Sequence, residues 1–131
     1  MKATIETSGK TIYQHLTQAK ENGLLYPSIT IDKFTFTLAP ATGANYGCVY
    51  VKIKPTKQYL GKIGTDNRFY PARETREEDC YKIAAIRDDL HGAMKAHGQQ
   101  TGRCSCCGRL LTAESSINAM IGPICAEKFG F

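Results

Sequence analysis

SITIDKFTFTLA, at residues 28–39, is the stretch that decides the fold. Apolar and polar residues alternate along it, and many are β-branched or aromatic, a pattern typical of a β-strand. We predict two further strands, over Tyr46–Lys54 and Gln58–Ile63, and then a short extended piece with the sequence RFYP. About three strands joined by short links predict a small antiparallel meander.

One helix is predicted before this sheet and one after it. Ser8 is suited to cap a helix that begins near Gly9 and ends at Asn22-Gly23. A long central helix is predicted from about Glu74 to Gly98, because its apolar residues recur at steps of three and four: Ile83, Ile86, Leu90, Met94 and His97. The fold class is therefore α+β, with residues 1–98 forming a domain whose helices pack on one sheet face and residues 99–131 forming a separate module packed on it.

Composition excludes some classes of protein. The chain has 131 residues, 42% of them hydrophobic, with a formal net charge of +5. No apolar run approaches the ~20 residues that cross a membrane, and the N-terminus lacks the apolar core of a signal peptide. We therefore expect a cytoplasmic protein without a membrane partner. In that compartment clustered cysteines indicate a metal or catalytic site before they indicate disulfides.

Four of the six cysteines lie in the last 31 residues, TGRCSCCGRLLTAESSINAMIGPICAEKFGF. Cys104 and Cys107 form C-x2-C, and Gly108 lets the backbone turn so that amides point toward the sulfurs. Pro123 suits the first position of a helix, which places Cys125 in the first helical turn, where a thiolate is stabilised. A knuckle followed by a ligand at a helix start predicts a treble-clef-like structural Zn²⁺ site.

The fourth zinc ligand stays open between Cys106 and His97. Cys106 adjoins Cys107, and adjacent side chains usually diverge. His97 could fold back toward Cys104, or it could simply continue the apolar stripe of the central helix and form a local hydrogen bond. The competing interpretations of the whole cluster are a set of partly buried free thiols and, more weakly, a redox C-x-x-C.

The cysteine-rich stretch closely resembles a short domain of unknown function found mainly in proteins of bacteriophages and other mobile elements. The matching features are Gly102, Cys104, Cys107-Gly108-Arg109, Leu111-Thr112, Ser116 and Gly122-Pro123-x-Cys125, with Met120 where a glycine is usual. The resemblance implies a phage or prophage origin and a zinc site at Cys104, Cys107 and Cys125. Arg109 and Ser116 are motif residues in it, and Arg109 could act as a counter-charge to the thiolates. It implies no reaction.

A nucleic-acid interface is predicted on the polar side of the second strand. Tyr50, Lys52 and Lys54 alternate with Val49, Val51 and Ile53, and further basic residues follow close in sequence: Lys57, Lys62 and Arg68. Lysines can neutralise phosphates while rings such as Tyr59, Phe69 and Tyr70 stack on exposed bases. The alternative is that these lysines are only the solvated side of a sheet.

No motif of a known catalytic class is present, so we predict a non-enzymatic protein with no small-molecule substrate. The function predicted is a small zinc-binding phage or prophage accessory protein in the cytoplasm of the host bacterium, with nucleic acid or a host nucleoprotein complex as its partner. The alternative is a phage inhibitor of a host defence system, comparable to an anti-CRISPR protein, that acts by protein–protein contact. Nucleic-acid binding should weaken steeply with salt, whereas a mainly apolar protein interface should not.

Overall fold

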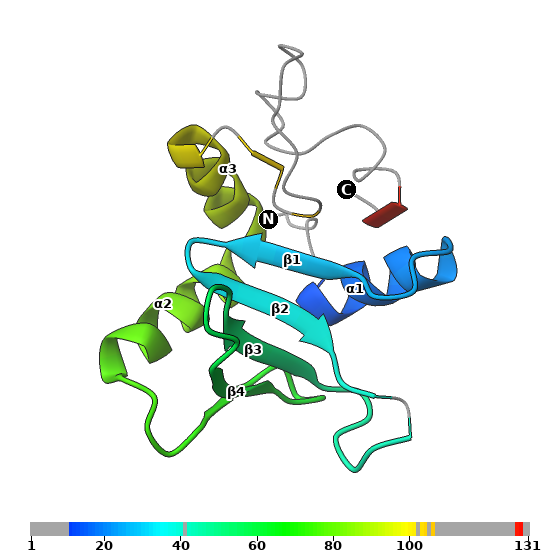
Figure 1. The fold of residues 1–131 in the computed structure, drawn as a ribbon, viewed down its shortest axis with the longest axis horizontal. Helices are drawn as coiled ribbons and strands as arrows, with labels where there is room; N and C mark the ends of the chain where they lie inside the picture. The colour runs from blue at the N-terminus through cyan, green and yellow to red at the C-terminus, as the bar shows by residue number, and fades with distance from the viewer. Residues whose placement is uncertain (1–10, 41, 102, 105, 107–127, 130–131) are drawn as a thin grey trace, which may run out of the picture.

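The computed structural model describes residues 11–40, 42–101, 103–104, 106 and 128–129. Its elements follow in the order α1 (Ile12–Glu21), β1 (Ser28–Ile31), β2 (Phe34–Leu38), β3 (Val49–Ile53), β4 (Tyr59–Ile63), β5 (Phe69–Pro71), α2 (Glu77–Asp88) and α3 (Leu90–Thr101). All five strands form one antiparallel sheet in the order β1-β2-β3-β4-β5 (Figure 1). The predicted α+β class with a small antiparallel sheet is confirmed, although the sheet has five strands and not three.

The stretch predicted as one strand over residues 28–39 is in fact the hairpin β1–β2. Ile31 pairs with Phe34, so only Asp32 and Lys33 form the turn. Asp32 has a φ of 57°, a left-handed conformation in which Asp is several-fold enriched among non-glycine residues. The prediction failed because the apolar–polar alternation continues on both sides of this turn.

The extended piece RFYP supplies the fifth strand. Phe69–Pro71 pairs with Gly61–Ile63 and ends the sheet on one side. Pro71 lacks a backbone N–H and is therefore tolerated on an edge strand. The sheet is a meander in which each strand lies beside its neighbour in sequence, and this places the β1–β2 hairpin at the opposite edge from β5.

Helix α1 begins at Ile12 and its N-cap is Thr11, not Ser8. The Thr11 hydroxyl accepts a hydrogen bond from the Gln14 backbone N–H, and the Gln14 side chain accepts one from the Thr11 N–H. These reciprocal bonds form a capping box, which satisfies two amide groups that a helix start leaves without partners. The predicted end at Asn22-Gly23 is confirmed.

The predicted long central helix is two helices, α2 and α3, divided at Asp89. Asp89 leaves the helical conformation at φ −141° and ψ 73°, and its carboxylate accepts a hydrogen bond from the Gly92 N–H. Asp89 therefore caps α3. A Cβ at position 92 would collide with this carboxylate, so the capping geometry favours glycine there. Helix α3 also continues past Gly98, where we expected it to stop, as far as Thr101.

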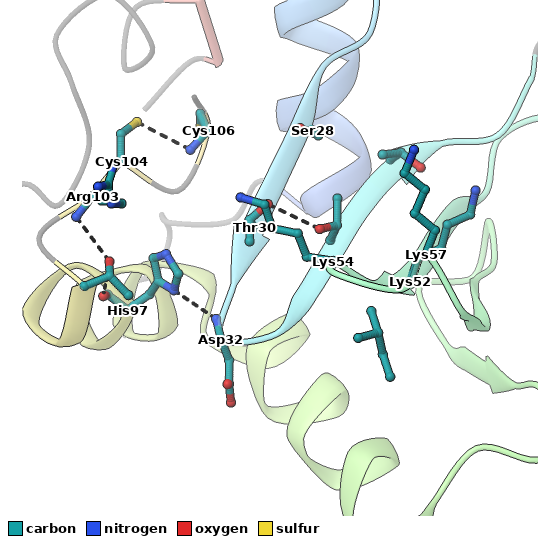
Figure 2. A pocket seen from close by; sticks show the side chains of 14 residues that line it. Ser28, Thr30, Asp32, Lys52, Lys54, Lys57, His97, Arg103, Cys104 and Cys106 are labelled. Atoms are coloured by element: carbon teal, nitrogen blue, oxygen red, sulfur yellow. Dashed lines mark hydrogen bonds between the residues drawn. The ribbon is translucent and has the colours of Figure 1, made fainter. Parts of the chain in front are cut away.

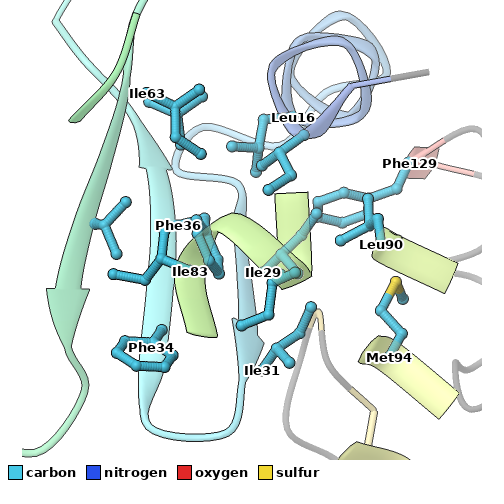
Figure 3. Close-up of a cluster of buried hydrophobic side chains, with 14 of the residues drawn as sticks. Leu16, Ile29, Ile31, Phe34, Phe36, Ile63, Ile83, Leu90, Met94 and Phe129 are labelled. Atoms are coloured by element: carbon cyan, nitrogen blue, oxygen red, sulfur yellow. The ribbon is translucent and has the colours of Figure 1, made fainter. Parts of the chain in front are cut away.

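One hydrophobic core lies between the sheet and the helices (Figure 3). Figure 1 shows α1 and α2 behind the sheet and α3 beyond the β1 edge. The predicted apolar stripe is confirmed, because its five members on α2 and α3 are all buried: Ile83, Ile86, Leu90, Met94 and His97. Among the described residues, none of the helices has both the length and the apolar character needed to span a membrane.

Residues near the C-terminus belong to the same core. Phe129 is 1% exposed and Cys104 is 2% exposed, and both are members of the main cluster. The Asn22 side chain donates to the Lys128 carbonyl at 2.9 Å, and the Lys128 ammonium donates to the Asn22 carbonyl at 3.1 Å. These bonds attach the chain around Phe129 to the end of α1. The division at residues 98 and 99 stays a prediction.

Candidate nucleic-acid interface

The sheet turns one face toward the helices and the other away from the core. Pairing partners share a face, so the register places Thr37, Tyr50, Lys62 and Tyr70 in one row across the sheet. A second row runs Thr30, Thr35, Lys52, Tyr59. We call these eight residues the open face, and none of their side chains is fully buried.

A β-bulge in β4 shapes the open face. Val51 pairs with Gly61 and Lys52 pairs with Tyr59, so Leu60 is an additional residue in β4. The bulge lets Tyr59 and Lys62, three positions apart, lie on the same face, while Leu60 is buried in the core. Without it, strand alternation would place Tyr59 and Lys62 on opposite faces.

Aromatic rings and ammonium groups contact one another on this face. The rings of Tyr50 and Tyr59 meet edge to face, with centroids 5.6 Å apart at 89°. The Lys52 ammonium lies 5.9 Å from the centroid of the Tyr50 ring. The Lys62 ammonium donates to the Asn45 side chain at 2.7 Å, and the Asn45 amide donates to the Tyr50 hydroxyl at 3.2 Å. The open face thus carries fixed aromatic surface beside positive charge.

A groove of about 870 Å³ runs between the open face and the segment after α3 (Figure 2). Its described cationic side chains are Lys52, Lys54, Lys57 and Arg103, and the single carboxylate among its described lining residues is that of Asp32. Hydroxyl groups complete the polar lining: Ser28, Thr30, Thr35, Thr37 and Thr101. This composition suits an extended anionic ligand, because cations neutralise phosphates and hydroxyls donate hydrogen bonds to them.

The structure brings together three of the five predicted nucleic-acid-binding residues. Lys52, Lys54 and Lys57 line the groove. Lys62 lies on the open face outside the groove. Arg68 is exposed at the β4–β5 turn, where its backbone N–H donates to the Asp66 carboxylate at 3.1 Å.

The predicted zinc ligands are only partly within the described residues. Cys104, Cys106 and His97 all line the groove. The Cys106 backbone N–H donates to the Cys104 sulfur at 3.4 Å. Cys107 and Cys125, together with the motif residues Gly108, Arg109, Ser116 and Pro123, lie outside the described residues. Within the described part of the chain no group of at least three His, Cys, Asp or Glu side chains is placed to hold a metal ion.

Thr101 directs the chain from α3 to Cys104. Its hydroxyl donates to the His97 carbonyl at 2.9 Å and accepts from the Arg103 N–H at 3.1 Å. The first bond satisfies a carbonyl near the helix end, and the second holds the chain as it leaves the helix. Arg103 is exposed at this point and faces the groove. Thr101 therefore positions one wall of the groove.

Sequence reasoning missed several groove residues. Arg103 had no distinguishing signal beyond its position next to Cys104. The threonines did carry one, because Thr30, Thr35 and Thr37 occupy the polar positions of the alternating stretch. These threonines converge on one groove only because the stretch folds as a hairpin, which the interpretation as a single strand does not provide.

Comparison with known protein families matches part of the chain. A family model described as "Family of unknown function (DUF6011)" matches residues 94–130. This range begins within α3 and includes His97, Arg103, Cys104 and Cys106, which line the groove. The predicted resemblance to a domain of unknown function is confirmed at this level. No curated protein and no solved structure matches the chain.

Proposed function

We propose that this protein binds nucleic acid along the open face and the groove, as a small accessory protein without an enzymatic activity of its own. The observation that carries the proposal is the excess of positive charge in the lining of the groove. Its described lining residues include four cations and a single carboxylate, that of Asp32; the cations are Lys52, Lys54, Lys57 and Arg103. A positive groove beside aromatic rings is the arrangement by which proteins bind single strands without sequence preference.

Exposure of the tyrosines favours single strands over duplexes. Tyr59 is 43% exposed and Tyr70 is 46% exposed, so part of each ring is available to an unpaired base. Bases in a duplex are already stacked and cannot reach such rings without unpairing. The threonines and lysines around the rings are then available to the sugar–phosphate backbone.

We also propose a structural Zn²⁺ ion bound by Cys104, Cys107 and Cys125. The hydrogen bond from the Cys106 N–H to the Cys104 sulfur supports this, since amides that point toward a sulfur stabilise the thiolate form that binds metal. Its role is to hold the segment that follows α3 against the core, where Cys104 is buried. The proposed setting is a phage or prophage protein acting in the host cytoplasm, supported by the motif resemblance of residues 102–125.

A protein partner is the second candidate. Leu25 is 78% exposed and Tyr26 is 92% exposed, and the two are adjacent in the loop between α1 and β1. Exposed large apolar side chains that lie together favour protein contact. This patch would support the alternative of an inhibitor that binds a host defence complex.

Fluorescence anisotropy separates the two candidates. A short labelled single-stranded oligonucleotide and the corresponding duplex are titrated with the protein at low and at physiological salt. We expect binding of the single strand that weakens steeply as salt rises. Absence of binding to either probe at low salt would contradict the proposal and favour the protein partner, which a Leu25→Ser and Tyr26→Ser double variant would then test in host-protein capture.

A further inference from the structure

Among the described residues that line the groove, His97 supplies the one buried imidazole ring. It lies on α3, the residue is 9% exposed, and its Nδ1 atom accepts a hydrogen bond from the Asp32 backbone N–H at 2.9 Å. Asp32 belongs to the two-residue turn of the β1–β2 hairpin. The contact therefore joins α3 to the β1–β2 edge of the sheet beside the groove.

The hydrogen bond fixes the tautomer of the ring. A backbone N–H can only donate, so Nδ1 must be the unprotonated nitrogen. In a neutral imidazole the proton then resides on Nε2. Burial, the largest cause, lowers the pKa of His97 below its ordinary value, which favours the neutral ring.

A ring in this state is a poor zinc ligand and a good hydrogen-bond donor. Zinc needs the lone pair of an unprotonated nitrogen, but the lone pair on Nδ1 already accepts from Asp32 and Nε2 carries a proton. Of the two candidates for the fourth ligand, His97 is thus the weaker. Figure 2 shows one ring nitrogen directed to Asp32 and the other turned away from it, and His97 lines the groove.

Lys54 lines the same groove and lies close enough to His97 for its positive charge to act on the ring. Its backbone N–H donates to the Lys33 carbonyl at 2.9 Å, and Lys33 is the second residue of the hairpin turn. Lys54 and His97 therefore flank one two-residue turn, each bonded to one of its members. An ammonium group and a neutral N–H donor together match the needs of a phosphate, one for its charge and one for a particular oxygen.

We propose that the Nε2–H group of His97 donates to a phosphate oxygen of the bound strand in the groove, beside Lys54. This inference rests on the proposed function and names the atom that anchors the strand backbone there. The Asp32 N–H is a positioning group, since it holds the ring in the donating tautomer. His97 is a phosphate-contacting residue and not a zinc ligand.

Two substitutions test the role of each ring nitrogen. In His97→Asn the side-chain oxygen can replace Nδ1 as the acceptor for Asp32, but the donor at Nε2 is lost. In His97→Gln the amide nitrogen can reach the Nε2 position and keep the donor. We expect His97→Asn to weaken binding of a single-stranded oligonucleotide by about tenfold, and His97→Gln to retain most of the affinity.

Salt dependence separates a neutral donor from a cation. Because the ring carries no charge, His97→Asn should leave the slope of log affinity against log salt unchanged. Lys54→Gln should instead make that slope shallower by about 0.7, the value for one phosphate on a single strand. Unchanged affinity in His97→Asn, or a loss of bound zinc in that variant alone, would overturn the proposal.

Nitrogen-15 spectroscopy of the wild-type protein tests the inference without any variant. The chain has three histidines, so the signal absent from His97→Asn, or from His97→Gln if the first does not fold, identifies the ring. We expect a protonated Nε2 whose resonance shifts saturably as inorganic phosphate is added. If oligonucleotides do not bind, the proposed function fails, and this phosphate titration still decides the His97 contact. A protonated Nδ1 or a resonance insensitive to phosphate would overturn it.

Discussion

The ring Nδ1 of His15 lies 2.6 Å from the carbonyl oxygen of Phe129, which joins residues 114 positions apart. A carbonyl oxygen can only accept, so the His15 Nδ1–H group donates. Both residues are buried, and the Phe129 ring packs into the core beside Leu90 (Figure 3). The segment around Phe129 therefore helps to stabilise α1 and the sheet. Removing its contacts should lower the free energy of unfolding of the whole domain.

Removal of the Phe129 ring should destabilise the whole domain. Phe129→Ala deletes a fully buried ring, a change that typically costs about 3–5 kcal/mol. We expect urea unfolding to show this loss in a single transition, monitored by circular dichroism. Tyr26→Ala is the control, because Tyr26 is 92% exposed and its removal should change the free energy of unfolding by less than about 0.5 kcal/mol. Equal small effects would show that Phe129 is not a core residue.

Zinc should copurify at about one ion per chain, as a four-ligand structural site requires. We expect Cys104→Ser to lose the metal and to lower the midpoint of thermal unfolding, because Cys104 is buried in the core. Cys80→Ser serves as the control, since Cys80 is only half-buried on α2, away from the groove. Elemental mass spectrometry of the purified proteins gives the ratio. A wild-type protein that purifies without metal, and whose unfolding midpoint does not rise when zinc is added, would contradict the zinc proposal.

Acid should destabilise the wild-type protein more than His97→Asn. Burial lowers the pKa of His97 below its ordinary value of 6.5, with Lys54 adding to this and Asp32 and Cys104 opposing it. The unfolded chain then binds the proton more readily than the folded protein, so this stability is present above about pH 6.5 and is lost as the pH falls through the folded value. Urea unfolding of both proteins at neutral and at mildly acidic pH provides the comparison. Identical pH dependence in the two would exclude a lowered pKa.

Tyr59 should contribute to binding through its exposed ring. Tyr59→Ala removes a stacking surface, and loss of one base–aromatic contact weakens binding by about 1–3 kcal/mol, or roughly 5- to 150-fold. Tyr81→Ala is a matched control, because Tyr81 is 68% exposed but lies on α2, away from the open face. Anisotropy titrations with a single-stranded oligonucleotide measure both. If the two variants bind equally well, the open face does not stack bases.

Both turns that the predictions missed, at Asp32-Lys33 and at Asp89, have a signal in the sequence. Ile29 and Ile31 stand at odd positions and Phe34 and Phe36 at even ones, and this change of parity at Asp32-Lys33 is the mark of a two-residue turn. Likewise Asp89, followed three residues later by Gly92, was a cap signal inside an apolar stripe that continued unbroken. At Asp32-Lys33 only the phase of the alternation changes, and at Asp89 the helical period continues, so the presence of a period alone locates neither turn.

The site was less predictable, for a different reason. Strand alternation predicts that Lys52 and Lys54 lie on the polar side of their strand. The groove, however, depends on contacts between segments that are distant in the sequence. The bond between Asp32 and His97 spans 65 positions, and no local pattern specifies it. The β4 bulge that brings Tyr59 onto the open face is also a product of register, which a single strand does not reveal.

The central claim is that the positive charges in the groove, and not the net charge of the protein, bind nucleic acid. A matched pair of variants tests this claim most directly. One variant replaces Lys52, Lys54 and Lys57 with Gln, and the other replaces Lys20, Arg73 and Lys82, exposed residues away from the groove. Each substitution removes one positive charge, so the three in either variant lower the formal net charge from +5 to +2.

The measurement is the slope of log affinity against log salt for a single-stranded oligonucleotide. We predict that the groove variant binds weakly with a slope shallower by about two, whereas the other variant keeps the wild-type slope and most of its affinity. Equal losses in both variants would mean that only net charge matters and would contradict a binding site in the groove.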